Sequence, residues 1–291
     1  GLTGYEGIDV RGPLVASADV SGILGNPQIT GQVRSEGARV ESAQLGTVID
    51  QISLDARFTQ SRLELVRFAG RAGKDGSIVG TGGIDLVQER GFPMDIRLRL
   101  KNAELAKRDD LAGIASGNVR IATDEYGGVL SGKLTVERAT YRIGRAAAVE
   151  VPVLAVIEKN SRVLGRRTVQ YAAPTRWLLN MDVKGDRRLF VEGMGITSEW
   201  QADVRVRGGA TTPELFGRVQ LVRGDYDFAG KRFQLTRGDV RFQGLFPPDP
   251  VIAIQAENVS NGFTAQLNID GTAQRPNIKF SSIPALPEDE V

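Results

Sequence analysis

Hydrophobic and polar residues alternate with a period of two along much of the chain. The stretch FTAQLNID, residues 263–270, shows this most clearly, because four apolar residues alternate with four polar ones. Residues 52–58, 94–100, 132–144 and 201–208 give further examples. This period is typical of β-strands with one apolar and one solvated face. The pattern predicts a mostly β protein built around a long antiparallel-type sheet.

A helical pattern occurs once, in NAELAKRDDLAGIASG at residues 102–117. Asn102 can cap the start of a helix, Leu105 and Leu111 fall near one face, and Gly117 can end it. The sequence therefore predicts one short helix near residues 102–116.

An arginine-rich stretch without periodicity, residues 161–174, predicts a loop. With this loop as a boundary, we expect a strand-rich segment at residues 1–175, which holds the predicted helix. Residues 176–291 then form a C-terminal β domain.

One short pattern occurs three times: a glycine, a proline five residues later, and Ile or Leu two residues after the proline. The three copies begin at Gly22, Gly208 and Gly271. The glycine suits the end of a strand, and the proline fixes φ in the turn that follows. Each copy therefore predicts a connection between two neighbouring strands.

Two copies of Arg-Gly-Asp lie 14 residues apart, in LVRGDYDF at 221–228 and LTRGDVRF at 235–242. Strict alternation would put the leucine and the phenylalanine of each copy on opposite faces. A one-residue bulge at the Arg-Gly step restores a common face, and glycine suits bulges that need positive φ. We therefore predict two bulged strands joined by a turn at residues 229–232. A remote alternative is an extracellular adhesin that presents these tripeptides on exposed loops.

The composition narrows the chemistry. The chain has no cysteine and no histidine, which excludes disulfides, thiolate or imidazole metal sites and His-based triads. The net charge of +2 does not suggest a nucleic-acid-binding protein. Asp109–Asp110 and Asp124–Glu125 are paired carboxylates, but adjacent solvated residues are not expected to converge as an acid/base pair with shifted pKa values. No apolar run is long enough for a membrane-spanning helix. We expect no enzyme activity, cofactor or metal.

The sequence GRVQLVRGDYDFAGKRFQLTRGDVRFQG, residues 217–244, is similar to the most characteristic stretch of the TamB family. Residues 187–215 resemble the strand pair that precedes this stretch. DPVIAIQA, FTAQLNIDGTAQRPNIKFSS and PALPEDEV follow it in the family's order. The resemblance is specific over residues 187–291, whereas the first half resembles the family by pattern only.

The resemblance implies a long β-sheet curled into an open trough with an apolar interior (a β-taco), as in the AsmA-like and bridge-like lipid transfer proteins. It implies a periplasmic protein held in the inner membrane by an N-terminal helix outside this chain. The implied partner is TamA, an outer-membrane barrel of the Omp85 class. The implied processes are phospholipid traffic and the assembly of autotransporters and other outer-membrane proteins. We also expect the protein to continue before Gly1 and after Val291.

An apolar sheet face without a covering layer should hold an apolar ligand, because large exposed patches are rare. We expect acyl chains to lie in a groove lined by twelve residues: Leu221, Tyr226, Phe228, Phe233, Leu235, Val240, Phe242, Ile252, Ile254, Phe263, Leu267 and Ile269. Two alternatives stay open. The faces could close on each other as a sandwich core, or the sheet could accept strands of client outer-membrane proteins by β-augmentation.

The C-terminal SSIPALPEDEV contains two prolines, which preclude a central strand. We expect an exposed, extended segment at the sheet edge. The resemblance suggests a docking element for the outer-membrane partner, made by Pro284, Leu286, Pro287, Glu288 and Asp289. A frayed terminus is the alternative.

Overall fold

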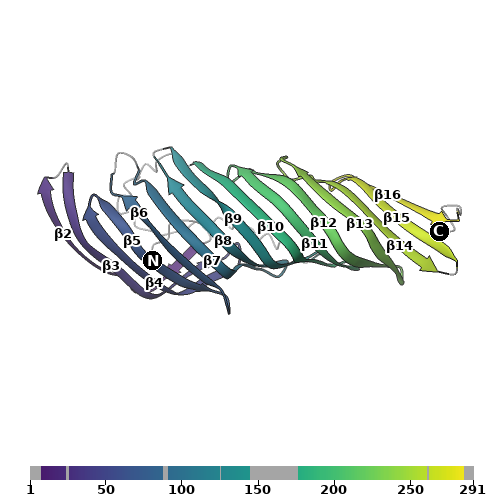
Figure 1. The fold of residues 1–291 in the computed structure, drawn as a ribbon, viewed down its shortest axis with the longest axis horizontal. Coiled ribbons are helices and arrows are strands. Elements are labelled where there is room, and N and C mark those ends of the chain that lie inside the picture. The colour runs from purple at the N-terminus through teal and green to yellow at the C-terminus, as the bar shows by residue number, and fades with distance from the viewer. Residues whose placement is uncertain are drawn as a thin grey trace, which may run out of the picture.

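The computed structural model describes residues 8–23, 26–87, 91–124, 126–144, 176–260 and 262–284. In this part of the chain, 16 β-strands form one continuous sheet, and there is no helix. Figure 1 shows the strands side by side along the long axis of the molecule, with β2 at one end and β16 at the other. The predicted mostly β fold with one long sheet is confirmed.

The strands have these bounds: β1 Ile8–Arg11, β2 Val15–Ile23, β3 Asn26–Ser42, β4 Thr47–Gln60, β5 Arg62–Ala72, β6 Ser77–Asp85, β7 Met94–Lys107, β8 Leu111–Thr123, β9 Gly127–Arg142, β10 Arg176–Gly193, β11 Ile196–Gly208, β12 Pro213–Phe228, β13 Lys231–Gln243, β14 Val251–Ser260, β15 Phe263–Thr272 and β16 Pro276–Ile283.

Sheet order follows chain order from β3 to β16, and both β1 and β2 pair with β3. All these pairs are antiparallel except β9–β10, which is parallel. A parallel pair needs a long crossover, and the connection between Arg142 and Arg176 supplies one. The predicted loop at 161–174 lies within that connection and outside the described residues. Strands from both predicted domains belong to the same sheet, and the division at residue 175 stays a proposal.

The predicted helix at 102–116 is wrong. Residues 102–107 complete β7, and residues 111–117 begin β8. A tight turn joins them, because the Arg108 N–H donates to the Leu111 carbonyl at 2.7 Å and the Arg108 guanidinium binds Asp110 at 2.8 and 3.0 Å.

The helix-like spacing has a physical origin in β7. Register shifts between Leu100 and Ala103 and between Glu104 and Ala106 break the alternation of this strand. As a result, Leu100, Ala103 and Ala106 are all buried although they lie three residues apart. Bulges in a strand thereby imitate the apolar period of a helix.

The repeated glycine–proline pattern marks hairpins, as predicted. Gly208 pairs with Pro213 between β11 and β12, and Gly271 pairs with Pro276 between β15 and β16. The first copy does the same between β2 and β3, where Gly22 pairs with Pro27. In each copy the glycine lies within one residue of the end of one strand, and the proline lies within one residue of the start of the next.

Both Arg-Gly-Asp segments contain the predicted bulge, displaced by one residue. On β12, Leu221 pairs with Trp200 and Arg223 pairs with Glu199, so Val222 is the extra residue. On β13, Thr236 is the extra residue against β14. The leucine before each bulge therefore shares a face with the phenylalanine after it, as predicted, because one extra residue at either position reverses the alternation of faces.

The sheet curls towards its apolar face at the C-terminal end. The rings of Phe228 on β12 and Phe280 on β16 stack with their centroids 6.3 Å apart. Three strands lie between β12 and β16. A flat sheet would separate them by about 19 Å, at roughly 4.8 Å per strand. Strands β12 to β16 therefore form a trough whose two walls meet at these aromatic rings.

A second closure lies near the other end of the sheet. Thr47 Oγ1 on β4 donates to the Leu105 carbonyl on β7 at 2.6 Å, and the Lys107 N–H donates to the Leu45 carbonyl at 2.8 Å. The hairpin of β5 and β6 lies between β4 and β7 but turns back at residues 72–77. The start of β4 and the end of β7 therefore contact each other directly beyond that turn, and the sheet is curved there.

The curl predicts a specific crosslink in this cysteine-free chain. Cysteines replacing Phe228 and Phe280 should be joined by a short bifunctional thiol reagent, since the two side chains face each other. Cysteines replacing Asp227 and Lys279, which lie next to them in sequence and face the other side, should stay unjoined. Mass spectrometry of the treated protein checks both pairs, and equal crosslinking of the two pairs would contradict the curl.

Candidate functional site: the apolar face of the sheet

One row of side chains crosses eight neighbouring strands, from β6 to β13. Directly opposed residues share a face, so the register places them in line. The row consists of Ile78, Leu100, Gly117, Leu134, Val183, Val204, Gly217 and Phe242. It contains no charged or polar side chain, and each of its two glycines has a large apolar residue on either side.

A second row continues the same face to the C-terminal edge of the sheet. Leu235 on β13 pairs with Ala256, Ala256 with Leu267, and Leu267 with Phe280. The Thr236 bulge keeps Leu235 on the face that carries Phe242. The apolar face is therefore continuous from β6 to β16.

The register puts all twelve residues of the predicted groove on this face. Val240 pairs with Ile252, Tyr226 pairs with Phe233, and Leu221 pairs with Trp200 of the same face. The common face of these residues could be predicted from the sequence. One bulge in β12 and one in β13 are enough to put the leucine of each strand on the same face as its aromatic residues. Whether an acyl chain contacts these side chains stays a prediction.

Part of the apolar face forms a core, and part stays open. Phe233, Ala256 and Leu267 are buried, with Tyr226, Leu235, Ala265 and Ile269 packed against them. By contrast, the exposed fraction is 47% for Phe228, 41% for Phe263 and 37% for Phe280. The face therefore has a packed floor and accessible aromatic side chains along one margin.

Phe280 was missed from the sequence, although it forms one wall of the closure. A signal existed, because Ile278 and Phe280 alternate with polar residues directly after the third glycine–proline copy. Trp200 was not among the twelve predicted groove residues. It is 7% exposed, lies beside Leu221, and donates its indole N–H to Ser198 Oγ at 2.8 Å.

The glycines of the two Arg-Gly-Asp segments serve packing. A Cβ on Gly238 would lie 2.6 Å from Trp200 Cη2 and 2.7 Å from Leu221 Cβ, and one on Gly224 would lie 2.5 Å from Ser198 Cβ. Neither glycine has the positive φ that was expected of the bulges. Close approach of side chains on the apolar face therefore explains why glycine occupies these positions.

Positive φ is needed elsewhere on the same face. Gly117 and Gly217 lie in the first row and have φ of 149° and 126°. A Cβ on either would overlap the carbonyl oxygen of the facing strand, at Lys133 or Asp203. These glycines let neighbouring strands approach in a conformation that other residues rarely adopt.

The family model of the TamB C-terminal domain matches residues 66–291. The chain belongs to the TamB family. The match begins within β5 and therefore covers most of the TamB-type sheet, including strands that the sequence related to the family by pattern only. No curated protein matches the chain.

Membership of the TamB family fixes the general role. The family consists of non-enzymatic components of outer-membrane assembly and transport. Its members are envelope proteins that span the periplasm and function with an outer-membrane partner. Within the described residues, no three His, Cys, Asp or Glu side chains gather as metal ligands. No helix in that part of the chain is long and apolar enough to cross a membrane.

The polar residues of the Arg-Gly-Asp segments of this TamB chain make ion pairs on the opposite face. Arg223 Nε lies 2.8 Å from Glu199 Oε2, and Asp239 lies 2.6 Å from Arg241 and 3.3 Å from Arg218. Both tripeptides lie inside strands β12 and β13 and not on exposed loops. The geometry that the adhesin alternative requires is therefore missing.

Glu199 joins two strands at the bulge of β10. The backbone N–H of Arg188 donates to Glu199 Oε1 at 3.1 Å and lowers the pKa of this carboxyl. Burial opposes this shift, whereas Arg223 adds to it. The ionised carboxylate therefore stabilises the junction of β10, β11 and β12.

This lowered pKa predicts how stability depends on pH. The folded chain holds the Glu199 proton more weakly than the unfolded chain, whose glutamates titrate near about pH 4.3. The stabilisation by Glu199 is thus present at neutral pH and is lost as the pH falls through the lowered pKa. Urea unfolding of Glu199→Gln should show a deficit against the wild type at pH 7 that narrows below about pH 4. An equal deficit at both pH values would contradict this explanation.

The predicted docking segment is described at one residue only. Pro284 follows the end of β16 and is exposed, and the Ser282 hydroxyl donates to its carbonyl at 2.9 Å. Leu286, Pro287, Glu288 and Asp289 lie outside the described residues. The edge position expected for this region agrees with β16, which is the last strand of the sheet.

Proposed function

We propose that the apolar face of this sheet is a trough that shields the acyl chains of phospholipids between the inner and outer membranes. In this proposal the protein works in the periplasm, anchored in the inner membrane by a helix outside the described residues. It acts with the Omp85-class barrel TamA. The trough needs no catalytic group, because it lowers the free-energy cost of moving an acyl chain through water and changes no covalent bond.

The continuous apolar row from β6 to β13, extended by the second row to β16, carries this proposal. An acyl chain of about 16 carbons loses on the order of 13 kcal/mol of favourable burial when it enters water. A face that stays apolar across successive strands keeps most of that burial at each step. The curl seen at Phe228 and Phe280 supports the proposal, since a curled apolar face surrounds an acyl chain more fully than a flat one.

Lipid capture tests the proposal directly. The chain is incubated with vesicles that contain a fluorescent phospholipid, separated from the vesicles by flotation, and analysed for bound lipid. We expect phospholipid to remain with the free protein and to be protected from a water-soluble quencher. Protein without bound lipid, under conditions where the sheet stays folded, would contradict the proposal.

The exposed edge of the sheet favours a second candidate function. Among the described strands, β16 pairs only with β15, and all its side chains except one are exposed. An unpaired edge is a template for an incoming strand. A scaffold of this kind would accept strands of autotransporters and other client outer-membrane proteins without lipid transfer.

A single cysteine distinguishes the two candidates, because the native chain has none. Lys279→Cys on β16 should form disulfides with cysteines placed in a client β-strand if the edge accepts clients. Once a client strand is linked to this variant, its lipid capture should fall only if clients and lipids occupy the same trough. Absence of client disulfides together with normal lipid capture would leave the conduit as the function.

The C-terminal segment is proposed to dock the chain on its outer-membrane partner through Pro284, Leu286, Pro287, Glu288 and Asp289. Replacing Glu288 and Asp289 with lysine in the full-length protein should reduce co-purification with the barrel. Lipid capture by the trough should stay unchanged. Undiminished co-purification would remove this segment from the proposed interface.

A further inference from the structure

Two hollows lie on the polar face, opposite the trough. The first, here called the basic hollow, extends over β5 to β9 and has a volume of about 750 Å³. Five cationic residues line it, and no aspartate or glutamate does: Arg67, Arg97, Arg99, Arg120 and Lys133. Gly80, Leu98, Val119 and Gly132 pair with one another across the floor of the hollow.

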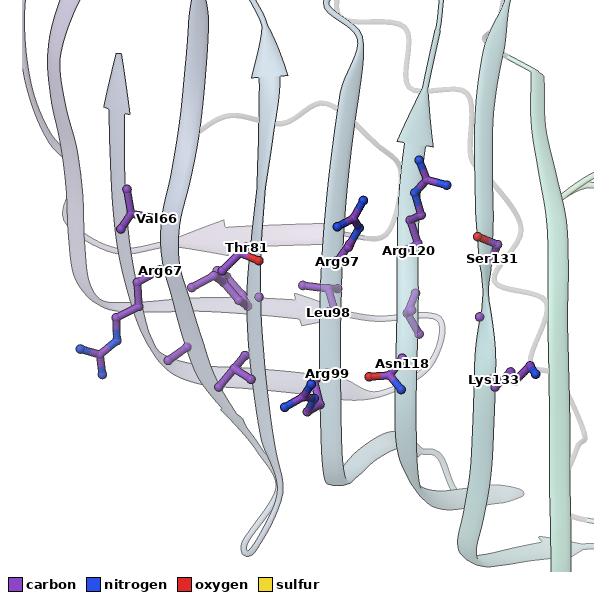
Figure 2. A pocket seen from close by; sticks show the side chains of 16 residues that line it. Val66, Arg67, Thr81, Arg97, Leu98, Arg99, Asn118, Arg120, Ser131 and Lys133 are labelled. Atoms are coloured by element: carbon purple, nitrogen blue, oxygen red, sulfur yellow. The ribbon is translucent and has the colours of Figure 1, made fainter. Parts of the chain in front are cut away.

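The register brings the cations of the basic hollow together. Arg97 and Arg99 lie two residues apart on β7, so they share a face at a spacing of about 7 Å. Arg120 on β8 pairs with Arg97, and Lys133 on β9 lies beside Asn118 of β8. Figure 2 shows these side chains on adjacent strands around one opening.

Asp95 offsets part of this charge from the margin of the hollow. Its carboxylate accepts hydrogen bonds from Arg120 at 2.8 and 3.0 Å and from Arg97 at 3.3 Å. Two further carboxylates lie at the margin of the hollow, because Asp55 pairs with Arg67 and Asp182 pairs with Lys133 across neighbouring strands. Three carboxylates thus stand against five cations, and the Arg97 side chain is still 73% exposed. An excess of positive charge therefore remains, with guanidinium groups accessible from solvent.

The second hollow shows that this excess is local. It extends over β9 to β12 on the same face, has a volume of about 850 Å³, and is here called the mixed hollow. Its lining combines cations with the carboxylates Asp182, Asp186 and Asp203. Lys184 pairs with Asp203 at 3.1 Å, and Asp182 pairs with Arg207 at 2.7 Å. Lys133 lines both hollows. Carboxylates form part of the lining of the mixed hollow, whereas those near the basic hollow lie only at its margin and are fewer than its cations.

We propose that the basic hollow binds a phosphate group. Guanidinium groups match phosphate oxygens with paired, charge-assisted hydrogen bonds, and Lys133 and Asn118 add donors. The phosphate can come from the headgroup of an anionic phospholipid at a membrane surface or from a soluble phosphate. The hollow faces away from the apolar trough, so this site does not depend on lipid transport through it.

The test compares two double variants that remove the same charge. Arg97→Gln/Arg99→Gln removes two cations from the basic hollow and the Arg97–Asp95 hydrogen bond, and it leaves both partners of the Asp95–Arg120 pair in place. Lys184→Gln/Arg205→Gln removes two cations from the mixed hollow. Binding is measured by flotation with phosphatidylcholine vesicles that either contain or lack phosphatidylglycerol, and by calorimetric titration with inorganic phosphate. Circular dichroism checks that each variant keeps the sheet.

We expect the first double variant to weaken binding by at least about tenfold and the second by less than about twofold. Binding should also weaken as salt is added, because the cations are exposed. Binding to phosphatidylglycerol vesicles alone identifies a headgroup as the source, and binding of inorganic phosphate identifies a soluble ligand. Equal loss in both double variants, or binding of neither probe by the wild type, would overturn the site.

Discussion

Gly238→Val is expected to lower the free energy of unfolding by about 3 kcal/mol. The new side chain would enter the space occupied by Trp200 and Leu221, which approach the position of its Cβ to 2.6 and 2.7 Å. Trp200 is buried and its indole N–H is bound to Ser198, so it cannot move away freely. Overpacking of this kind forces side chains and backbone away from their favoured positions.

A roomy glycine in another strand provides the control. Gly113 on β8 has no positive φ, and the nearest atom to a Cβ placed there is Ala106 Cβ at 3.9 Å. Gly113→Ala should be neutral or slightly stabilising, because it reduces the freedom of the unfolded chain. Urea unfolding midpoints of the two variants check the contrast. Comparable stability of Gly238→Val and the wild type would show that the apolar face is not packed as described.

A charge placed in the middle of the trough is expected to stop lipid passage. Leu134 lies in the first row on β9, between Gly117 and Val183. Leu134→Asp puts a carboxylate in the path of an acyl chain, which raises the barrier by about 3 kcal/mol. Delivery of labelled phospholipid to the outer membrane should therefore slow by roughly a hundredfold in cells that depend on the protein.

The adjacent residue supplies a matched control on the other face. Thr135 is exposed and pairs with Lys184, so Thr135→Asp adds the same carboxylate beside a cation. Delivery by Thr135→Asp should stay within about twofold of the wild type. Leu134→Ala, which shortens the side chain without a charge, should also keep delivery and so separates the electrostatic effect from lost packing. Equal delivery by the two aspartate variants would contradict a conduit on the apolar face.

The alternation of residues was sufficient to predict strands and their faces, because each strand has one apolar side. The glycine–proline copies also gave three hairpins, since proline and glycine each fix a local backbone requirement. The segment at 102–117 was misread for a definite reason. Two bulges in β7 space Leu100, Ala103 and Ala106 by three residues, and only pairing with β8 shows that this segment is extended.

Contacts between residues on distant strands could not be predicted from the alternation of residues. The sequence suggested that Gly238 is needed for a positive φ. In the structure, glycine is needed there because the Trp200 side chain from β11, about 40 residues earlier in the chain, leaves no room for a Cβ. The stacking of Phe228 on Phe280 likewise depends on how far five strands curl. The basic hollow was missed because its cations come from four different strands, each with an ordinary polar face.

Photo-crosslinking along the trough tests the central claim most directly. A photoreactive residue is placed in the full-length protein at Leu98 on β7, Val183 on β10 or Ile254 on β14, all on the apolar face. Lys101, Lys184 and Gln255, which lie on the polar face of the same three strands and outside the basic hollow, are the controls. We expect phospholipid adducts at all three apolar positions and at none of the controls. Purely intramolecular products at the apolar positions, or equal lipid adducts on both faces, would contradict a continuous acyl-chain conduit.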